Sequence, residues 1–174
     1  LAPKDSDIHL NLGAALREND ADAEAEIAFR HAITLDGRNG DAYRELANLL
    51  WEQDRLSEAY SAASNAVAND KDNPNTHLIH GVVMFDLGGF DQAVSVFEKI
   101  LKDDPNNLDA LLYLGRSHMA LGKVDRAIHT FEQAIEQTPD NDVVFRYLRE
   151  AYAMMRPSWL TGMLGDPKRN NAYQ

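Results

Sequence analysis

The chain has 174 residues, no cysteine, and 28 acidic against 17 basic side chains, which gives a formal charge of −11. This length suits one domain or a short repeat array, and a hydrophobic fraction of 44% is enough for a packed core. The negative charge argues against nucleic acid as partner, because phosphate binding needs clustered Lys and Arg. Without thiols, the chain has no disulfide, cysteine nucleophile, iron–sulfur cluster or thiolate zinc site.

The compartment is left open by the sequence. A chain without cysteine fits the cytoplasm or a bacterial periplasm equally well, and no segment approaches the ~20 apolar residues of a membrane-spanning helix. We therefore expect a soluble chain. Because it begins at Leu1 rather than Met, we interpret it as a trimmed or processed product, in which an upstream leader or anchor would not be visible.

Several columns of residues recur with a spacing of 34 positions, and such a period must be recognised before single helices are assigned. One column holds Ala25, Ala59, Ala93 and Ala127, and a second holds Asn39, Asn73, Asn107 and Asn141. Further columns are Leu12, Leu46, His80, Leu114 and Leu148; Gly13, Ala47, Gly81 and Gly115; and Phe29, Ala63, Phe97 and Phe131. The sequence therefore predicts four copies of one structural unit.

Within each unit the apolar spacing predicts two helices that face each other. In the fourth unit, Leu111, Leu114 and His118 mark one face of a first helix, and Ala127 and Phe131 mark the facing second helix. Small residues at 115 and 127 allow the two backbones to approach closely. The units are predicted at 6–39, 40–73, 74–107 and 108–141, after a flank at 1–5.

Caps and turns support this interpretation. The recurring Asn precedes each first helix, where its side chain can accept a backbone N–H. We expect Ser57, Asp91 and Asp125 to cap the second helices in the same way. Gly122, between the helices of the fourth unit, allows a left-handed C-terminal cap, and Gly88-Gly89 falls at the same place in the third unit.

The chain continues after the fourth unit with a capping helix at 142–156, a partial fifth unit. Its apolar residues lie on more than one side, so we expect another segment to cover it. At 157–174 a short helix and polar tail follow, in which a stripe of apolar side chains could supply the cover. The stripe consists of Trp159, Leu160, Met163 and Leu164.

The period and its residue types resemble the tetratricopeptide repeat (TPR) family. The best match is the series Leu114, Gly115, Gly122, Ala127, Phe131, Ala134 and Pro139. This resemblance implies an all-α fold, a right-handed α-solenoid of stacked antiparallel helix pairs, whose concave wall is lined by the first helices. Departures are local: Ala63 replaces the large aromatic residue of the second repeat, and Asp22 replaces a bulky residue in the first repeat.

No enzyme signature is present, so we expect a non-enzymatic chain that has no cofactor. The sequence contains no phosphate loop, G-x-S-x-G or HExxH motif. His77, His80 and His118 could bind a divalent metal if their rings converged, but His80 and His118 fall in inward columns and are better explained as packing residues. Glu24, Glu26, Asp103 and Asp104 are interpreted as solvated charges rather than acid–base pairs.

The resemblance also predicts where a partner would bind. Carried over column by column, the family's concave wall contains apolar side chains flanked by arginines, which are the usual components of a binding hot spot. The predicted groove residues are Arg44, Asn48, Trp51, Leu78, Val82, Phe85, Leu112, Arg116, Met119 and Arg146. We therefore expect a protein or peptide partner with apolar anchors and acidic groups, for a scaffold that assembles or recruits.

Other interpretations stay open at this point. The chain's own tail could fill the groove, the chain could be a substrate-positioning domain of a larger enzyme, or it could self-assemble as a homo-oligomer whose groove takes a neighbour's tail. The two-carboxylate clamp of chaperone-binding family members is disfavoured. Only Arg44 and Asn48 match that clamp, and Asp109 would repel a carboxylate.

Overall fold

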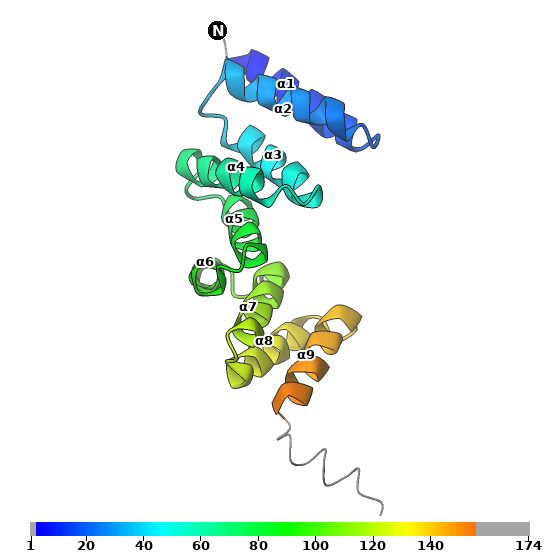
Figure 1. Cartoon of the computed structure of the whole chain (residues 1–174), viewed down its shortest axis with the longest axis vertical. Helices are drawn as coiled ribbons and strands as arrows, with labels where there is room; N and C mark the ends of the chain where they lie inside the picture. Colours follow the sequence, from blue (N-terminus) through cyan, green and yellow to red (C-terminus); the bar gives the residue numbers. More distant parts are fainter. Residues whose placement is uncertain (1–2, 156–174) are drawn as a thin grey trace, which may run out of the picture. The chain divides into compact units, whose positions relative to one another are not determined.

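The computed structural model describes residues 3–155, and within this range the chain forms nine helices and no strand (Figure 1). The helices are α1 (Pro3–Arg17), α2 (Asp22–Leu35), α3 (Gly40–Glu52), α4 (Leu56–Asn69), α5 (Pro74–Asp86), α6 (Phe90–Asp103), α7 (Leu108–Ala120), α8 (Val124–Gln137) and α9 (Asp142–Met155). None of these helices is both long and apolar enough to cross a bilayer. The stripe predicted at 159–164 lies outside the described range.

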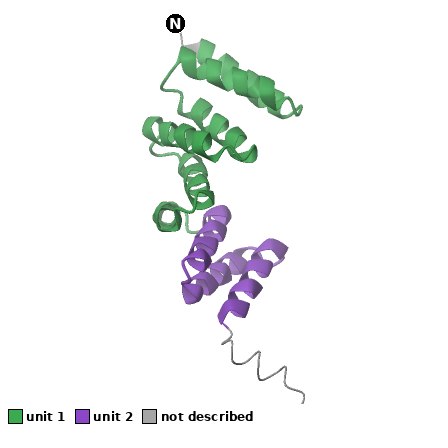
Figure 2. Ribbon diagram, in the orientation of Figure 1, with its two compact units in different colours: residues 1–105 green, residues 106–174 purple. Residues whose placement is uncertain are grey.

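The chain divides into two compact units, Leu1–Pro105 (unit 1) and Asn106–Gln174 (unit 2), which are described separately (Figure 2). In unit 1, α1 packs on α2, α3 on α4 and α5 on α6, and each pair contacts the next through α2 with α3 and α4 with α5. In unit 2, α8 contacts both α7 and α9. The predicted helix pairs are thus present, and the helices have 13 to 15 residues.

The recurring asparagines cap the first helices as predicted. The Oδ1 atom of Asn39 accepts a hydrogen bond from the backbone N–H of Ala42 at 2.9 Å, and that of Asn107 accepts one from Ala110 at 3.0 Å. Asn141 does the same before α9, accepting from Val143 at 3.0 Å. Each cap satisfies a backbone donor that has no partner inside the helix.

The predicted caps of the second helices are wrong. The residues at the cap positions of α4, α6 and α8 are Arg55, Gly89 and Lys123, and none of them makes a side-chain cap bond. These helices begin before Ser57, Asp91 and Asp125, which lie inside the first turn. The two acidic residues there still interact favourably with the positive end of the helix dipole.

Left-handed residues reverse the chain between the two helices of a pair. Gly88 has φ of 81° and Gly122 has φ of 69°, as the predicted turns require. Asp20 and Asp54 occupy the corresponding turns with φ of 57° and 59°. Aspartate tolerates this region better than most residues, so the same turn forms without glycine.

Close packing of an aromatic ring against a small residue forms the centre of three helix pairs. Phe29, Phe97 and Phe131 are completely buried. A Cβ atom added at Gly81 would lie 2.7 Å from Cε1 of Phe97, which no real contact allows. The small-residue column is therefore a steric requirement of helix pairing, as the sequence indicated.

One carboxylate that the sequence placed in solvent is instead held in an ion-pair network between α2 and α4. Glu26, whose side chain is 18% exposed, accepts from Arg55 at 2.7 Å and pairs with Arg30 at 2.7 Å. Arg55 also bonds Glu58 at 2.7 Å. The hydrogen bond from Arg55 is the main reason why the pKa of Glu26 is lowered.

Candidate partner-binding surfaces

In unit 1 the predicted groove residues lie on α3 and α5, two first helices that contact each other. Asn48 and Trp51 of α3 and Leu78 and Phe85 of α5 are all partly buried. We call these four residues the unit 1 surface. Because these side chains are only partly buried, a bound partner can remove further apolar area from water.

A hydrogen bond joins the two helices of the unit 1 surface. The indole Nε1 of Trp51 donates to Oδ2 of Asp86 at 2.6 Å. The bond satisfies the only polar atom of the tryptophan side chain and fixes the ring between α3 and α5. The pairing of Asp86 with Trp51 was not predicted.

Arg44 lies beside this surface, where its own helix neutralises it. Its guanidinium pairs with Asp41 at 3.0 Å and Glu45 at 3.0 Å, and its side chain is 23% exposed. Arg17 of α1 pairs with Glu52 at 2.6 Å and Glu45 at 3.4 Å. An acidic partner group would have to compete with these carboxylates, so Arg44 is less suited to the predicted role than its charge suggests.

Val82 belongs to the core rather than to the accessible surface, since it is only 5% exposed. Helix geometry places Leu78 and Phe85 one turn away on either side of it, and both are longer side chains. The Phe85 ring packs edge-on against Phe90 of α6, with centroids 5.3 Å apart. Phe85 is thus positioned by a second aromatic residue that the sequence did not connect with it.

In unit 2 two predicted arginines converge on one aromatic ring. The guanidinium carbon of Arg116 lies 5.3 Å from the Tyr147 ring centroid, and that of Arg146 lies 5.0 Å from it. Arg116 is also 4.7 Å from the Tyr113 centroid. Cation–π contact of this kind orients a guanidinium without neutralising its charge. Arg146 has no carboxylate within ion-pair distance among residues 3–155.

Sequence reasoning missed the two tyrosines that hold these arginines. Tyr113 and Tyr147 are 34 residues apart, and Tyr147 also stacks on the buried ring of Phe131 at 5.9 Å. That shared spacing is a signal that could have identified them. The predicted groove residues Leu112 and Met119 are partly buried on α7, which contacts α9. We call Leu112, Arg116, Met119 and Arg146 the unit 2 surface.

The histidines do not form a metal site in the part of the chain that the structure describes. There, no group of three or more His, Asp or Glu side chains could hold a metal ion. His80 packs on Tyr60, with centroids 5.4 Å apart, while Nε2 of His77 lies 2.7 Å from the carbonyl oxygen of Lys71. Burial lowers the pKa of His80, with a smaller contribution from His77.

Comparison with known proteins agrees with the predicted resemblance. A tetratricopeptide repeat family model matches residues 84–153. Among curated protein sequences, none matches the chain. The helix pairs and their period show the α-solenoid fold of tetratricopeptide repeat proteins, and residues 84–153 match the family model itself.

Solved structures with the same fold share about a fifth of their residues with this chain. The MamA protein is 19% identical, with a TM-score of 0.78 over 86% of this chain and 82% of that chain. YrrB, described as a TPR protein with an unusual peptide-binding site, is 21% identical, with a TM-score of 0.73 over 83% and 75%. A tetratricopeptide repeat protein from Parabacteroides merdae is 20% identical, with a TM-score of 0.77 over 86% and 59%.

Proposed function

We propose that this chain is a non-enzymatic protein-interaction scaffold, which assembles or recruits partners by binding a peptide or helix on its first-helix surfaces. The tetratricopeptide repeat fold favours an interaction scaffold. One structurally similar protein, YrrB, is described as having a peptide-binding site, which is consistent with this use of the fold.

The observation that carries the proposal is the pair of arginines on Tyr147. Arg116 and Arg146 face one ring from two helices, beside the apolar Leu112 and Met119. Helix pairing does not need a guanidinium at either position, since Phe131 of α8 packs against Gly115 of α7 and Tyr147 of α9. An arginine beside an aromatic ring and aliphatic side chains is typical of a binding hot spot.

We infer a division of roles between the two surfaces. The unit 1 surface supplies Trp51, Leu78 and Phe85 as apolar anchors, and its arginines are already paired with carboxylates. The unit 2 surface supplies Arg146 for acidic groups of the partner, with Arg116 stacked beside it on the Tyr147 ring. A segment bound to the unit 1 surface would then carry bulky apolar side chains, and one bound to the unit 2 surface would carry carboxylates.

A displayed library of random peptides, selected on the immobilised full chain, tests this partner chemistry. We expect selected peptides to be enriched in large apolar and acidic residues. Enrichment in lysine and arginine would contradict the proposal, because the selected peptides would then bind the carboxylates of the chain. A selected peptide also provides a defined probe for the variants described next.

Two variants and two matched controls locate the binding site. Phe85→Ala should weaken peptide binding by ~2 kcal/mol, about 30-fold, at any salt concentration. Arg146→Glu should weaken it most at low salt, because a surface charge acts through long-range attraction. Ile27→Ala on α2 and Arg126→Glu on α8 change exposed residues of the second helices and should have little effect. If only the control changes reduce binding, the partner binds the second helices and the assignment is wrong.

A further inference from the structure

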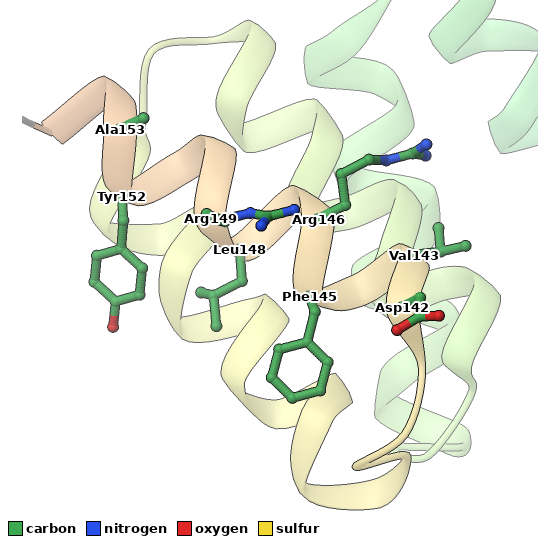
Figure 3. Close-up of a pocket in the computed structure, with 8 residues that line it drawn as sticks. All are labelled: Asp142, Val143, Phe145, Arg146, Leu148, Arg149, Tyr152 and Ala153. Atoms are coloured by element: carbon green, nitrogen blue, oxygen red, sulfur yellow. The ribbon is translucent and has the colours of Figure 1, made fainter.

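The outer face of α9, formed by Phe145, Leu148 and Tyr152, is a mainly apolar surface that the described residues cover only in part: Leu148 is partly buried, and the Tyr152 hydroxyl donates to Oε1 of Glu132 on α8 at 2.7 Å. The three side chains project from one side of the helix, while Val143 and Arg146 point away from them (Figure 3). Phe145 and Tyr152 are each 45% exposed. Among the described residues, a hollow along α9 is lined by this helix alone, with Phe145, Leu148 and Tyr152 in its lining together with Val143 and Arg146.

The repeat shows what the same columns do when they are covered. The residues 34 positions earlier, Leu111, Leu114 and His118, are 2%, 7% and 3% exposed. They are buried because α8 packs on α7 as the second helix of that pair. The outer face of α9 is therefore the equivalent of a surface that elsewhere receives a second helix.

A standard second helix would not fit this face. Gly115 of α7 touches the Phe131 ring so closely that an added Cβ would lie 2.6 Å from Cζ. In α9 the equivalent position is Arg149, which has a long side chain instead of a hydrogen atom. A helix with an aromatic ring in the place of Phe131 cannot come as close to α9, so the occupant must be a segment of another kind.

We propose that residues 157–164 of the same chain cover the outer face of α9. This segment follows the helix directly and carries four apolar side chains in two adjacent pairs, Trp159 with Leu160 and Met163 with Leu164. Its spacing places the two pairs on one side of a short helix. Pro157 suits the first position of such a helix.

The connecting chain is long enough for this contact. Trp159 is the fourth residue after Met155, a reach of up to ~10 Å at about 3.5 Å per residue as far as Pro157 and about 1.5 Å per residue in the helix that begins there. Leu148 lies seven residues before Met155, about 10 Å along the helix axis. Trp159 and Leu160 can thus reach Leu148 and Tyr152, and Met163 and Leu164 can reach Phe145. A short tether also gives an effective concentration in the mM range, which favours this occupant over a second copy.

Tryptophan fluorescence tests the inference, because the chain has only two tryptophans. In the full chain carrying Trp51→Phe, all tryptophan emission comes from Trp159. We expect emission at short wavelength and protection from acrylamide quenching. Adding Leu148→Ser and Phe145→Ser should shift the emission to longer wavelength and remove the protection. The control Val143→Ser changes an exposed residue on the other side of α9 and should leave both unchanged.

Three results would overturn the proposal. Solvent-exposed emission in the Trp51→Phe chain means that Trp159 is not covered. Protected emission that survives Leu148→Ser and Phe145→Ser means that it is covered elsewhere. Protection that disappears on dilution, together with dissociation in light scattering, identifies a second copy as the occupant. Far-ultraviolet circular dichroism of each variant must show that the helices are retained.

A cross-linking measurement keeps the proposal testable if the serine variants unfold. The chain contains no cysteine, so Tyr152→Cys with Trp159→Cys introduces the only pair of thiols. Mild oxidation should close a disulfide within one chain, seen as a faster-migrating monomer. The control pair Val143→Cys with Trp159→Cys should not close. Equal closure of both pairs would mean that the segment has no preferred face, which contradicts the proposal.

Discussion

Gly115 of α7 lies directly against the ring of Phe131 of α8, and no larger residue would fit between the two helices. An added Cβ would be 2.6 Å from Cζ of the ring. In the second repeat the same two columns hold Ala47 and Ala63, both completely buried. There the methyl group of Ala47 is accommodated because the facing aromatic ring is missing. The two columns therefore vary together for a steric reason.

We expect Gly115→Ala to destabilise the chain by ~1–3 kcal/mol, the usual cost of overpacking a well-packed core. Combining it with Phe131→Leu should cost less than the sum of the two single changes, because the smaller side chain leaves room for the methyl group. Urea unfolding followed by circular dichroism measures all three variants. Gly37→Ala is the control, since the nearest atom to its added Cβ is 3.9 Å away. Additive costs would contradict the steric explanation.

Gly122 is required for a different reason, its backbone conformation. Its φ is 69°, and an added Cβ would meet nothing within 4 Å. Gly122→Ala should therefore cost ~1 kcal/mol through left-handed strain alone. Gly122→Asn should cost less, because asparagine tolerates this region, as Asp20 and Asp54 do in equivalent turns. Thermal unfolding of the two variants measures the difference. Equal losses would show that φ is not the cause.

These two glycines illustrate what the sequence could predict. Helix pairs, turn residues and first-helix caps depend on neighbours at fixed offsets, so the period of 34 residues predicts them correctly. The second-helix caps were misplaced because Ser57, Asp91 and Asp125 suit both a cap and a first turn, and the choice depends on the preceding turn. The residue at which each second helix begins is determined by the left-handed residue in the preceding turn. The capping preferences of single residues do not reveal it.

Charged side chains were predicted less well than apolar ones. Arg55 pairs not only with Glu58, three residues later, but also with Glu26, 29 residues earlier. Arg17 similarly reaches Glu52, 35 residues later. Long flexible side chains choose among several partners across neighbouring helices, so a column treated by itself does not show which pairs form. The stacking of Arg116 on Tyr147 was missed for the same reason, whereas Arg44 is neutralised by Asp41 and Glu45 of its own helix.

The Arg55 network should make stability depend on acid pH. Hydrogen bonds from Arg55 lower the pKa of both Glu26 and Glu58 in the folded chain. Their contribution is therefore present above the unfolded carboxyl pKa of about 4.3 and is lost as pH falls through the lower folded values. Arg55→Gln should reduce the urea midpoint at neutral pH and have a smaller effect at about pH 3.

Arg38→Gln is the control for this experiment, because Arg38 is exposed and its side chain has no ion-pair partner within residues 3–155. Its urea midpoint should follow that of the unchanged chain at every pH. A difference between Arg55→Gln and the unchanged chain that is equally large at both pH values would contradict the assigned cause.

His80 should make the chain less stable as pH falls through the histidine range. It replaces the leucine of its column and lies between helices α4 and α5, where its ring packs on Tyr60 and its Nε2 is 3.3 Å from the Ser64 hydroxyl. Burial, assisted by the nearby His77, lowers its pKa. The unfolded chain therefore binds the proton first, at about pH 6.5, and stability declines below that value until the folded pKa is reached.

His80→Leu restores the residue that Leu46 and Leu114 provide in neighbouring repeats, and it should remove this part of the pH dependence. Ser64 keeps a partner in the variant, since its hydroxyl also donates to the carbonyl oxygen of Tyr60 at 2.8 Å. We expect the melting temperature of the unchanged chain to fall more than that of His80→Leu between about pH 7.5 and about pH 5.5. The exposed His129→Leu on α8 should behave like the unchanged chain. Parallel curves for the unchanged chain and His80→Leu would show that His80 takes up its proton without loss of packing, and the burial argument would then be wrong.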